Sequence, residues 1–259
     1  MYPFYMVIGS INGLICLFGG NQNTTCICNP VTREYVVLPK FARDSEDQYT
    51  HWSCGFGYLP TTNEYKAVVL NTSDREIDFI EVAVYTLGSC NGWKAVERLN
   101  TRLAKVYVYP GRGVFVNGSL HWRDKQEGKV VAFDLTEEKF SEYPPPHPCL
   151  SIRGWPDFTI GELGGVLYYA VEHKRQATRF TSSDIWLLKR KNDIPEMKEP
   201  LGWSGGVLCF DHRSLHIYNA ISTLSRKLVD FAHLSFYNRL FPHKITLISL
   251  KELEKMIYK

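Results

Sequence analysis

The chain has 259 residues, which is long enough to bury a self-supporting core without disulfides or a structural metal. Apolar residues make up 44% of the chain and charged residues 22%, so a disordered or membrane-embedded protein is excluded. The net charge is +3 and the longest basic run is Lys189-Arg190-Lys191, which argues against a nucleic-acid partner.

Turn-forming and aromatic residues are frequent, with 19 Gly, 13 Pro and 14% aromatic side chains, and this composition favours short strands joined by tight turns. The first predicted unit spans about residues 4–40 and holds four strands, with turns at Asn12-Gly13 and at residues 29–32. The second unit, about residues 53–98, repeats the order of strands and turns. Each unit is therefore expected to be an antiparallel sheet.

The third unit, about residues 113–144, is the clearest. Its Asn117-Gly118 pair supplies the two positive-φ positions of a type I′ hairpin turn, and Pro144 ends the last strand. A fourth unit covers about residues 158–199. A fifth covers about residues 205–250, with a weaker fourth strand at residues 245–248, and apolar spacing after residue 250 predicts one short C-terminal helix.

These units start near residues 4, 53, 113, 158 and 205, a spacing of about 50 residues, which is typical of the blades of a propeller. We therefore predict an all-β, β-propeller-like fold of about five four-stranded antiparallel blades, closed or incomplete, in a single domain over residues 1–259. A pair of β-sandwiches is the alternative, because regular strand spacing does not separate the two.

Several short motifs follow one another along the chain. They are Gly9-Ser10-Ile11-Asn12-Gly13-Leu14, Asn29-Pro30-Val31-Thr32-Arg33 with Leu38-Pro39, Gly55-Phe56-Gly57-Tyr58, Val84-Tyr85-Thr86-Leu87, and Val116-Asn117-Gly118-Ser119-Leu120-His121-Trp122. In this order they resemble the plant F-box-associated interaction domain, the C-terminal module of a large family of F-box proteins. The resemblance covers roughly residues 9–250. A kelch propeller is the runner-up, because Gly-Gly pairs recur.

The resemblance implies a substrate receptor of an SCF-type E3 ubiquitin ligase, in which this domain captures the target protein to be ubiquitinated. In that family an N-terminal F-box holds a Skp1-like adaptor, and no segment before Gly9 can supply an F-box. We therefore expect the Skp1-like adaptor as a partner only if an F-box lies upstream. The alternatives are a glycan- or small-molecule-binding propeller, a propeller enzyme, and a fragment with no role in ligation.

The seven cysteines, an odd number, fall mostly in apolar runs, where a thiol behaves as a small apolar side chain. This usage favours a reducing compartment. The first residues lack the basic and apolar regions of a secretory signal, and no apolar stretch is long enough to span a bilayer. We expect a cytoplasmic or nuclear protein with no membrane partner.

No constellation for catalysis, a metal or a cofactor is predicted. The segment from Gly202 to Gly206 matches a nucleophile elbow, but a strand and not a helix follows it. His212 and His216 have no third ligand nearby, and Cys26 and Cys28 have no partner pair at a matching spacing.

The candidate partner-binding residues are aromatic and basic side chains that we place in the connections between blades, since Trp, Tyr and Arg dominate interface energetics. They are His51, Trp52, Tyr107, Tyr109, Arg112, Arg153, Trp155 and Trp203.

Overall fold

The computed structural model describes thirteen stretches of the chain, and the account below concerns these alone. They are residues 5–19, 24–40, 50–73, 79–100, 111–124, 128–144, 158–174, 181–191, 194–198, 206–210, 214–219, 224–230 and 245–255. They form two units, one of residues 1–198 with 243–259 and one of residues 199–242, and each is described by itself.

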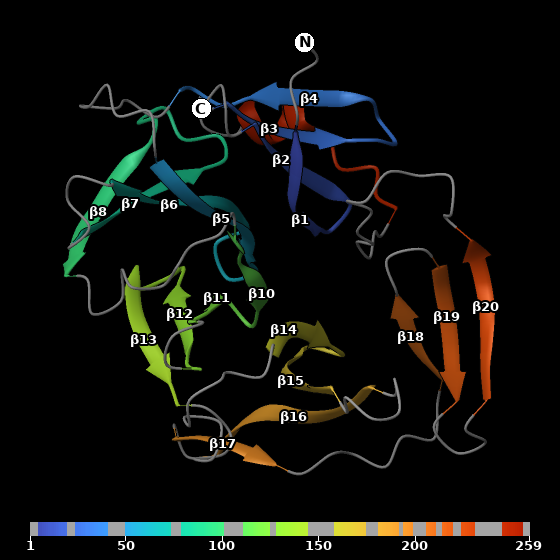
Figure 1. Ribbon diagram of the computed structural model, residues 1–259. Helices are drawn as coiled ribbons and strands as arrows, with labels where there is room; N and C mark the ends of the chain where they lie inside the picture. Colours follow the sequence, from blue (N-terminus) through green and yellow to red (C-terminus); the bar gives the residue numbers. More distant parts are fainter. Residues whose placement is uncertain are drawn as a thin grey trace. The chain divides into compact units, whose positions relative to one another are not determined.

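The first sheet has the order β1-β2-β3-β4 and is antiparallel throughout (Figure 1). Its strands are β1 (Met6–Ile11), β2 (Leu14–Gly19), β3 (Thr24–Asn29) and β4 (Glu34–Val37). Asn12 and Gly13 have φ values of 49° and 83°, so the predicted Asn-Gly hairpin is confirmed.

The second sheet has one strand more than predicted, in the order β8-β7-β6-β5-β9. Its strands are β5 (Thr50–Leu59), β6 (Glu64–Ser73), β7 (Phe79–Thr86), β8 (Lys94–Asn100) and β9 (Gly111–Arg112). The two-residue β9 runs parallel to β5 and pairs with Ser53 and Cys54. It therefore supplies partners for the edge of β5 that β6 leaves open.

The third and fourth sheets each contain the four strands that the sequence predicts, in the orders β10-β11-β12-β13 and β14-β15-β16-β17. The strands of the third sheet are β10 (Val114–Val116), β11 (Ser119–Arg123), β12 (Val130–Asp134) and β13 (Lys139–Tyr143). Those of the fourth are β14 (Phe158–Leu163), β15 (Val166–Lys174), β16 (Thr181–Lys191) and β17 (Ile194–Lys198).

The smaller unit contains a three-stranded sheet of β18 (Gly206–Phe210), β19 (Ser214–Asn219) and β20 (Leu224–Asp230). The fourth strand expected at residues 245–248 is not a strand. These residues belong to the larger unit, where the side-chain amide of Asn29 binds the carbonyls of Thr246 and Ile248. The predicted short helix is confirmed as α1 (Leu250–Lys255), which follows directly.

Three apolar clusters hold the larger unit together, and each lies between two sheets that are consecutive in the chain. Ile27 of the first sheet and Phe56 of the second belong to one cluster, which Leu250 of α1 also joins. Val68 of the second sheet and Phe133 of the third belong to the next, and the last joins the third and fourth sheets. Both faces of the second and third sheets are thus apolar, as is typical of sheets stacked in a repeat.

Candidate functional site

Three of the eight predicted binding residues lie in strands and not in connections, which corrects the prediction. His51 and Trp52 are part of β5, because β6 is long enough to pair with them through Thr72 and Asn71. Arg112 lies half-buried in β9, next to β5. The structure therefore brings these three residues onto two neighbouring strands. The other five, Tyr107, Tyr109, Arg153, Trp155 and Trp203, lie outside the described residues.

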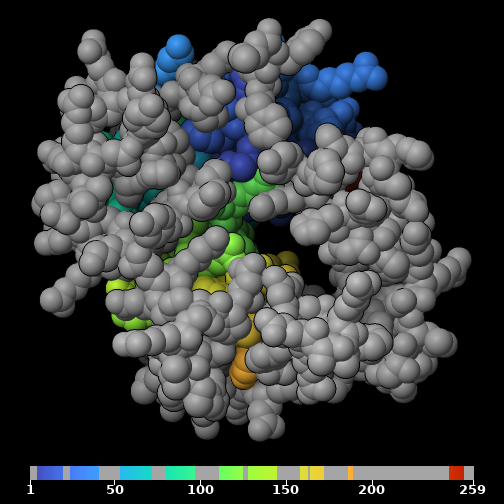
Figure 2. Space-filling view, in the orientation of Figure 1, coloured from blue at the N-terminus to red at the C-terminus, as the bar shows by residue number. Residues whose placement is uncertain are grey.

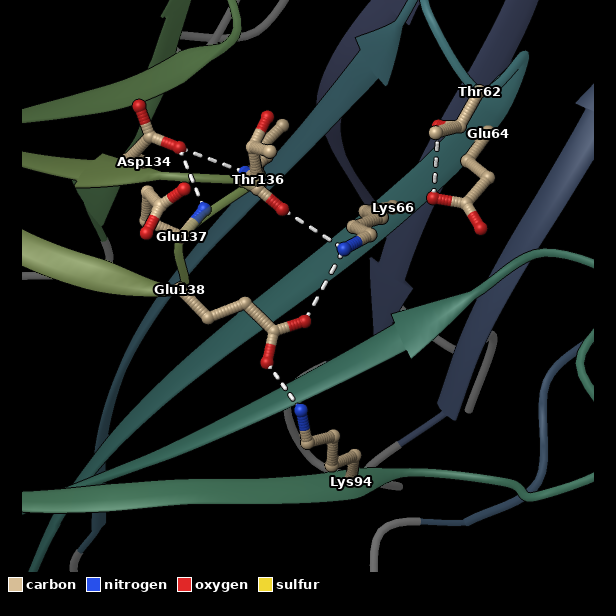
Figure 3. A network of polar contacts seen from close by, with 9 residues as sticks. Thr62, Glu64, Lys66, Lys94, Asp134, Thr136, Glu137 and Glu138 are labelled. Atoms are coloured by element: carbon tan, nitrogen blue, oxygen red, sulfur yellow. Dashed lines mark hydrogen bonds and ion pairs between the residues drawn. The ribbon is translucent and has the colours of Figure 1, made fainter.

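A network of charges connects the second and third sheets (Figure 3). The Nζ of Lys66, on β6, donates to the Leu135 carbonyl at 2.8 Å and to the Glu138 carboxylate at 3.2 Å. The Nζ of Lys94 donates to the other Glu138 oxygen at 2.6 Å. Glu138 has a φ of 54° in the β12–β13 turn, where the Asp134 carboxylate accepts hydrogen bonds from the amides of Thr136 and Glu137.

The Glu138 carboxyl is held in its charged form by this network. Burial raises its pKa, but the hydrogen bonds from Lys94 and Lys66 outweigh this effect, and the pKa lies below the ordinary value for glutamate. A carboxylate that two lysines already neutralise is a poor proton donor at neutral pH. The network therefore has the properties of a structural connection rather than an acid–base pair.

Four of the five described thiols are poorly suited to nucleophilic or metal chemistry, and the fifth, Cys90, is exposed. Cys16 and Cys54 are fully buried, and burial raises the pKa of both thiols. Burial also raises the pKa values of Cys26 and Cys28. Among the described side chains, no group of three or more His, Cys, Asp or Glu residues is arranged to hold a metal ion.

The turn between β3 and β4 binds the C-terminal segment, a contact that sequence reasoning missed. Asn29 is fully buried; its Nδ2 donates to the carbonyls of Thr246 at 3.2 Å and Ile248 at 2.8 Å, while its Oδ1 accepts from the Val31 amide. The Glu34 carboxylate accepts from the Ser249 hydroxyl and from the Leu250 amide at the start of α1. Serine is favoured directly before a helix, so Ser249 is the signal in the sequence for the start of α1.

Replacing Asn29 by aspartate should lower the free energy of unfolding by about 1–3 kcal/mol, because the carboxylate keeps the acceptor for Val31 but faces two carbonyls without a donor. Urea denaturation measures this loss, and proteolysis should cut the C-terminal segment sooner. Thr62→Ala is the control, since Thr62 bonds only to Glu64 in an exposed turn. Equal losses in both variants would contradict the role given to Asn29.

The large apolar side chains that are exposed in the described part of the chain come from residues 5–37 and residues 245–247. They are Tyr5, Val31, Tyr35, Val37, Ile245 and Leu247. All lie on or beside the first sheet or on the C-terminal segment that its turn binds. Exposed apolar side chains on an outer strand such as β4 make that strand a candidate protein interaction surface.

No helix in the described residues has the length and apolar character that crossing a bilayer requires.

Comparison with known proteins identifies relatives of one kind. An F-box/kelch-repeat protein of Arabidopsis thaliana is 25% identical over 197 residues, which is 74% of this chain and 50% of the relative. An F-box protein of the same plant is 26% identical over 213 residues, 72% of this chain and 48% of the relative. The chain thus spans about half the length of these curated relatives.

Among solved structures, a luciferin-regenerating enzyme matches 89% of this chain and 88% of its own, at 12% identity and a TM-score of 0.33. A similarity this low carries no argument about activity. By contrast, the family model described as the F-box associated beta propeller domain matches residues 1–189, which include the first three sheets and the fourth as far as Lys189 in β16. This match covers more than half of the chain and agrees with its motifs and its four-stranded sheets, so the chain belongs to the F-box associated beta propeller domain family.

Proposed function

We propose that this chain is the target-binding domain of an F-box protein and captures a protein for ubiquitination by an SCF-type ligase. The observation that carries the proposal is the family match over residues 1–189, together with curated relatives that are F-box proteins. The role is binding and not catalysis. It is exercised in the cytoplasm or the nucleus, where the buried thiols of Cys16 and Cys54 would stay reduced.

The proposed domain spans residues 1–259, and each of the five sheets contributes one blade. The target is a protein. A Skp1-like adaptor joins only through an F-box, so the ligase role depends on such a segment being attached to this domain. The eight aromatic and basic residues predicted from the sequence remain candidates for the target contact.

Two versions of the chain test this function: the chain alone, and the chain fused behind the F-box of the F-box/kelch-repeat relative. From a plant cell extract, both should retain the same proteins, and only the fusion should also retain the adaptor and a cullin. With purified ligase components, only the fusion should then transfer ubiquitin to the retained proteins. The proposal is wrong if both versions retain no more protein than a heat-unfolded sample, or if the retained proteins are not modified.

A further inference from the structure

The outer strand of the first sheet, β4, differs from β13, the outer strand of the third sheet. On β4, Tyr35 is 70% exposed and Val37 is 55% exposed. On β13, the outer strand of the third sheet, the exposed positions are Lys139, Ser141 and Glu142. Polar and charged residues are the usual protection of a sheet edge against pairing with other chains. β13 has this protection and β4 does not.

The backbone of β4 also offers hydrogen-bonding groups at this edge. The Leu38 amide donates to the Thr25 carbonyl, and the register places Cys28 opposite Tyr35 and Cys26 opposite Val37. Because hydrogen-bonded and non-hydrogen-bonded pairs alternate in an antiparallel ladder, the N–H and C=O groups of Tyr35 and Val37 point away from β3. No strand among the described residues pairs with β4 on that side.

Further exposed apolar side chains lie at the β3–β4 turn, at one end of this edge. Val31 precedes β4, and Ile245 and Leu247 are 76% and 81% exposed on the segment that Asn29 binds beside the β3–β4 turn. Figure 2 shows blue atoms of the first sheet at the surface of the molecule. A strand laid along β4 would therefore find an apolar neighbourhood.

The exposed charged side chains described around β4 are three cations, Arg33, Lys40 and Lys251, and one carboxylate, Glu252, and they determine which partner fits. Arg33 and Lys40 are exposed at the two ends of the strand, and Lys251 is exposed on α1 near Glu34, whose carboxylate is already bound to Ser249 and Leu250. A second copy of β4 would bring the same cations to this edge, so it offers them no complementary charge and fits less well than an acidic segment.

We propose that the β4 edge binds an extended segment of a partner protein, which adds to the first sheet as a fifth strand with alternating apolar residues and acidic residues at its ends. Main-chain hydrogen bonds to Tyr35 and Val37 give affinity, and the exposed cations set the preference for acidic sequences. The inference rests on the proposed role in target binding and names its surface.

The test is a selection of short random peptides displayed on phage against the whole chain. The selected peptides should alternate apolar residues and end in Asp or Glu. Val37→Pro should lower the affinity for these peptides at least about tenfold. It removes the N–H that Val37 points away from β3, while the hydrogen bonds between β3 and β4 stay intact. The double variant Arg33→Asn with Lys40→Gln should lower the affinity for the selected peptides about fivefold at low salt. The loss should be smaller at high salt, because salt screens the charges that the variant removes.

The matched control is Glu142→Pro, which puts the same ring into β13. There the bond from the Leu135 amide to the Gly118 carbonyl sets the alternation that points the Glu142 N–H outward. Binding that survives Glu142→Pro but not Val37→Pro, with thermal unfolding of both variants unchanged, supports the proposal. Recovery of no peptides, of basic peptides, or of peptides that bind Val37→Pro equally overturns it. Self-association of the wild type that Val37→Pro abolishes would assign the edge to a second copy and also overturn it.

The failure of this surface can be told apart from failure of the proposed function. A target that binds wild type and Val37→Pro alike overturns the β4 edge and leaves the target-binding role intact. Peptides that require Val37, in a chain that retains no target protein, support the edge and refute the ligase role.

Discussion

Replacing Lys66 by methionine should lower the free energy of unfolding by about 2–4 kcal/mol. Lys66 is only 7% exposed, and its ammonium binds both the Leu135 carbonyl and the Glu138 carboxylate. Methionine fills a similar volume but leaves these acceptors without their buried donor. Urea denaturation monitored by tryptophan fluorescence measures the loss.

Lys94→Met is the matched control, because Lys94 binds the same carboxylate from a side chain that is 68% exposed. Its loss should cost less than about 1 kcal/mol. If both substitutions lower the free energy of unfolding by the same amount, the burial of Lys66 does not explain the stability that its contacts provide.

The same network predicts how stability changes with pH. The pKa of Glu138 is lowered in the folded state, so its contribution is complete above the ordinary glutamate pKa of about 4.3 and is lost as pH falls through the folded pKa. The difference in stability between the wild type and Glu138→Gln should therefore be constant at neutral pH and shrink below about pH 4. A difference that grows in acid would contradict this assignment.

Replacing Gly57 by alanine should destabilise the protein by about 1–3 kcal/mol, and valine should cost more. A Cβ at this position of β5 would lie 2.2 Å from the Leu135 Cδ1 and 2.9 Å from the Phe115 ring. Leu135 is fully buried, so a shift of its side chain would disturb the packing around it. The absence of a side chain at Gly57 thus lets the second and third sheets pack closely. Thermal unfolding of the alanine and valine variants measures how much stability is lost when this packing is disturbed.

A double-mutant cycle with Leu135→Ala provides the control. Leu135→Ala alone removes a buried side chain and should cost about 2–5 kcal/mol. In the Gly57→Ala background it should cost about 0.5–3 kcal/mol less, because the new methyl group occupies the space that is vacated. If the stability losses of the two single variants simply add in the double variant, the methyl group added at Gly57 is accommodated by a shift of residues other than Leu135.

Features that depend on neighbouring residues could be predicted from the sequence. The turns at Asn12-Gly13 and Asn117-Gly118 are set by two residues that tolerate positive φ, and both have it. The strands on either side follow from these turns, as does the four-strand order of the first, third and fourth sheets.

Features that depend on distant partners could not be predicted. The two residues of β9 form a strand only because β5 lies beside them. Residues 245–248 have the apolar alternation of a strand, but Asn29, far away in the sequence, takes two of their carbonyls. Likewise, β5 extends back to His51 and Trp52 because β6 offers them a partner.

The candidate surface was missed for a similar reason. The predicted binding residues are aromatic and basic side chains expected in connections, whereas Tyr35 and Val37 have the sequence pattern of ordinary strand residues. Only the place of β4 at the end of the first sheet shows that their side chains and outward backbone groups are accessible. Local pattern indicates that a strand exists but not whether it lies at an edge.

The bond between Asn29 and the Thr246 carbonyl joins residues 217 positions apart, and this separation becomes a delay during synthesis. At ribosomal rates of about 5–20 residues per second, the partners of Asn29 emerge roughly 10–40 s after Asn29 itself. Throughout that interval the side-chain amide of Asn29 and the carboxylate of Glu34 lack the partners that residues 246–250 later provide. The first sheet is therefore completed only by residues made long after it, so it reaches its final stability after translation of the intervening sheets.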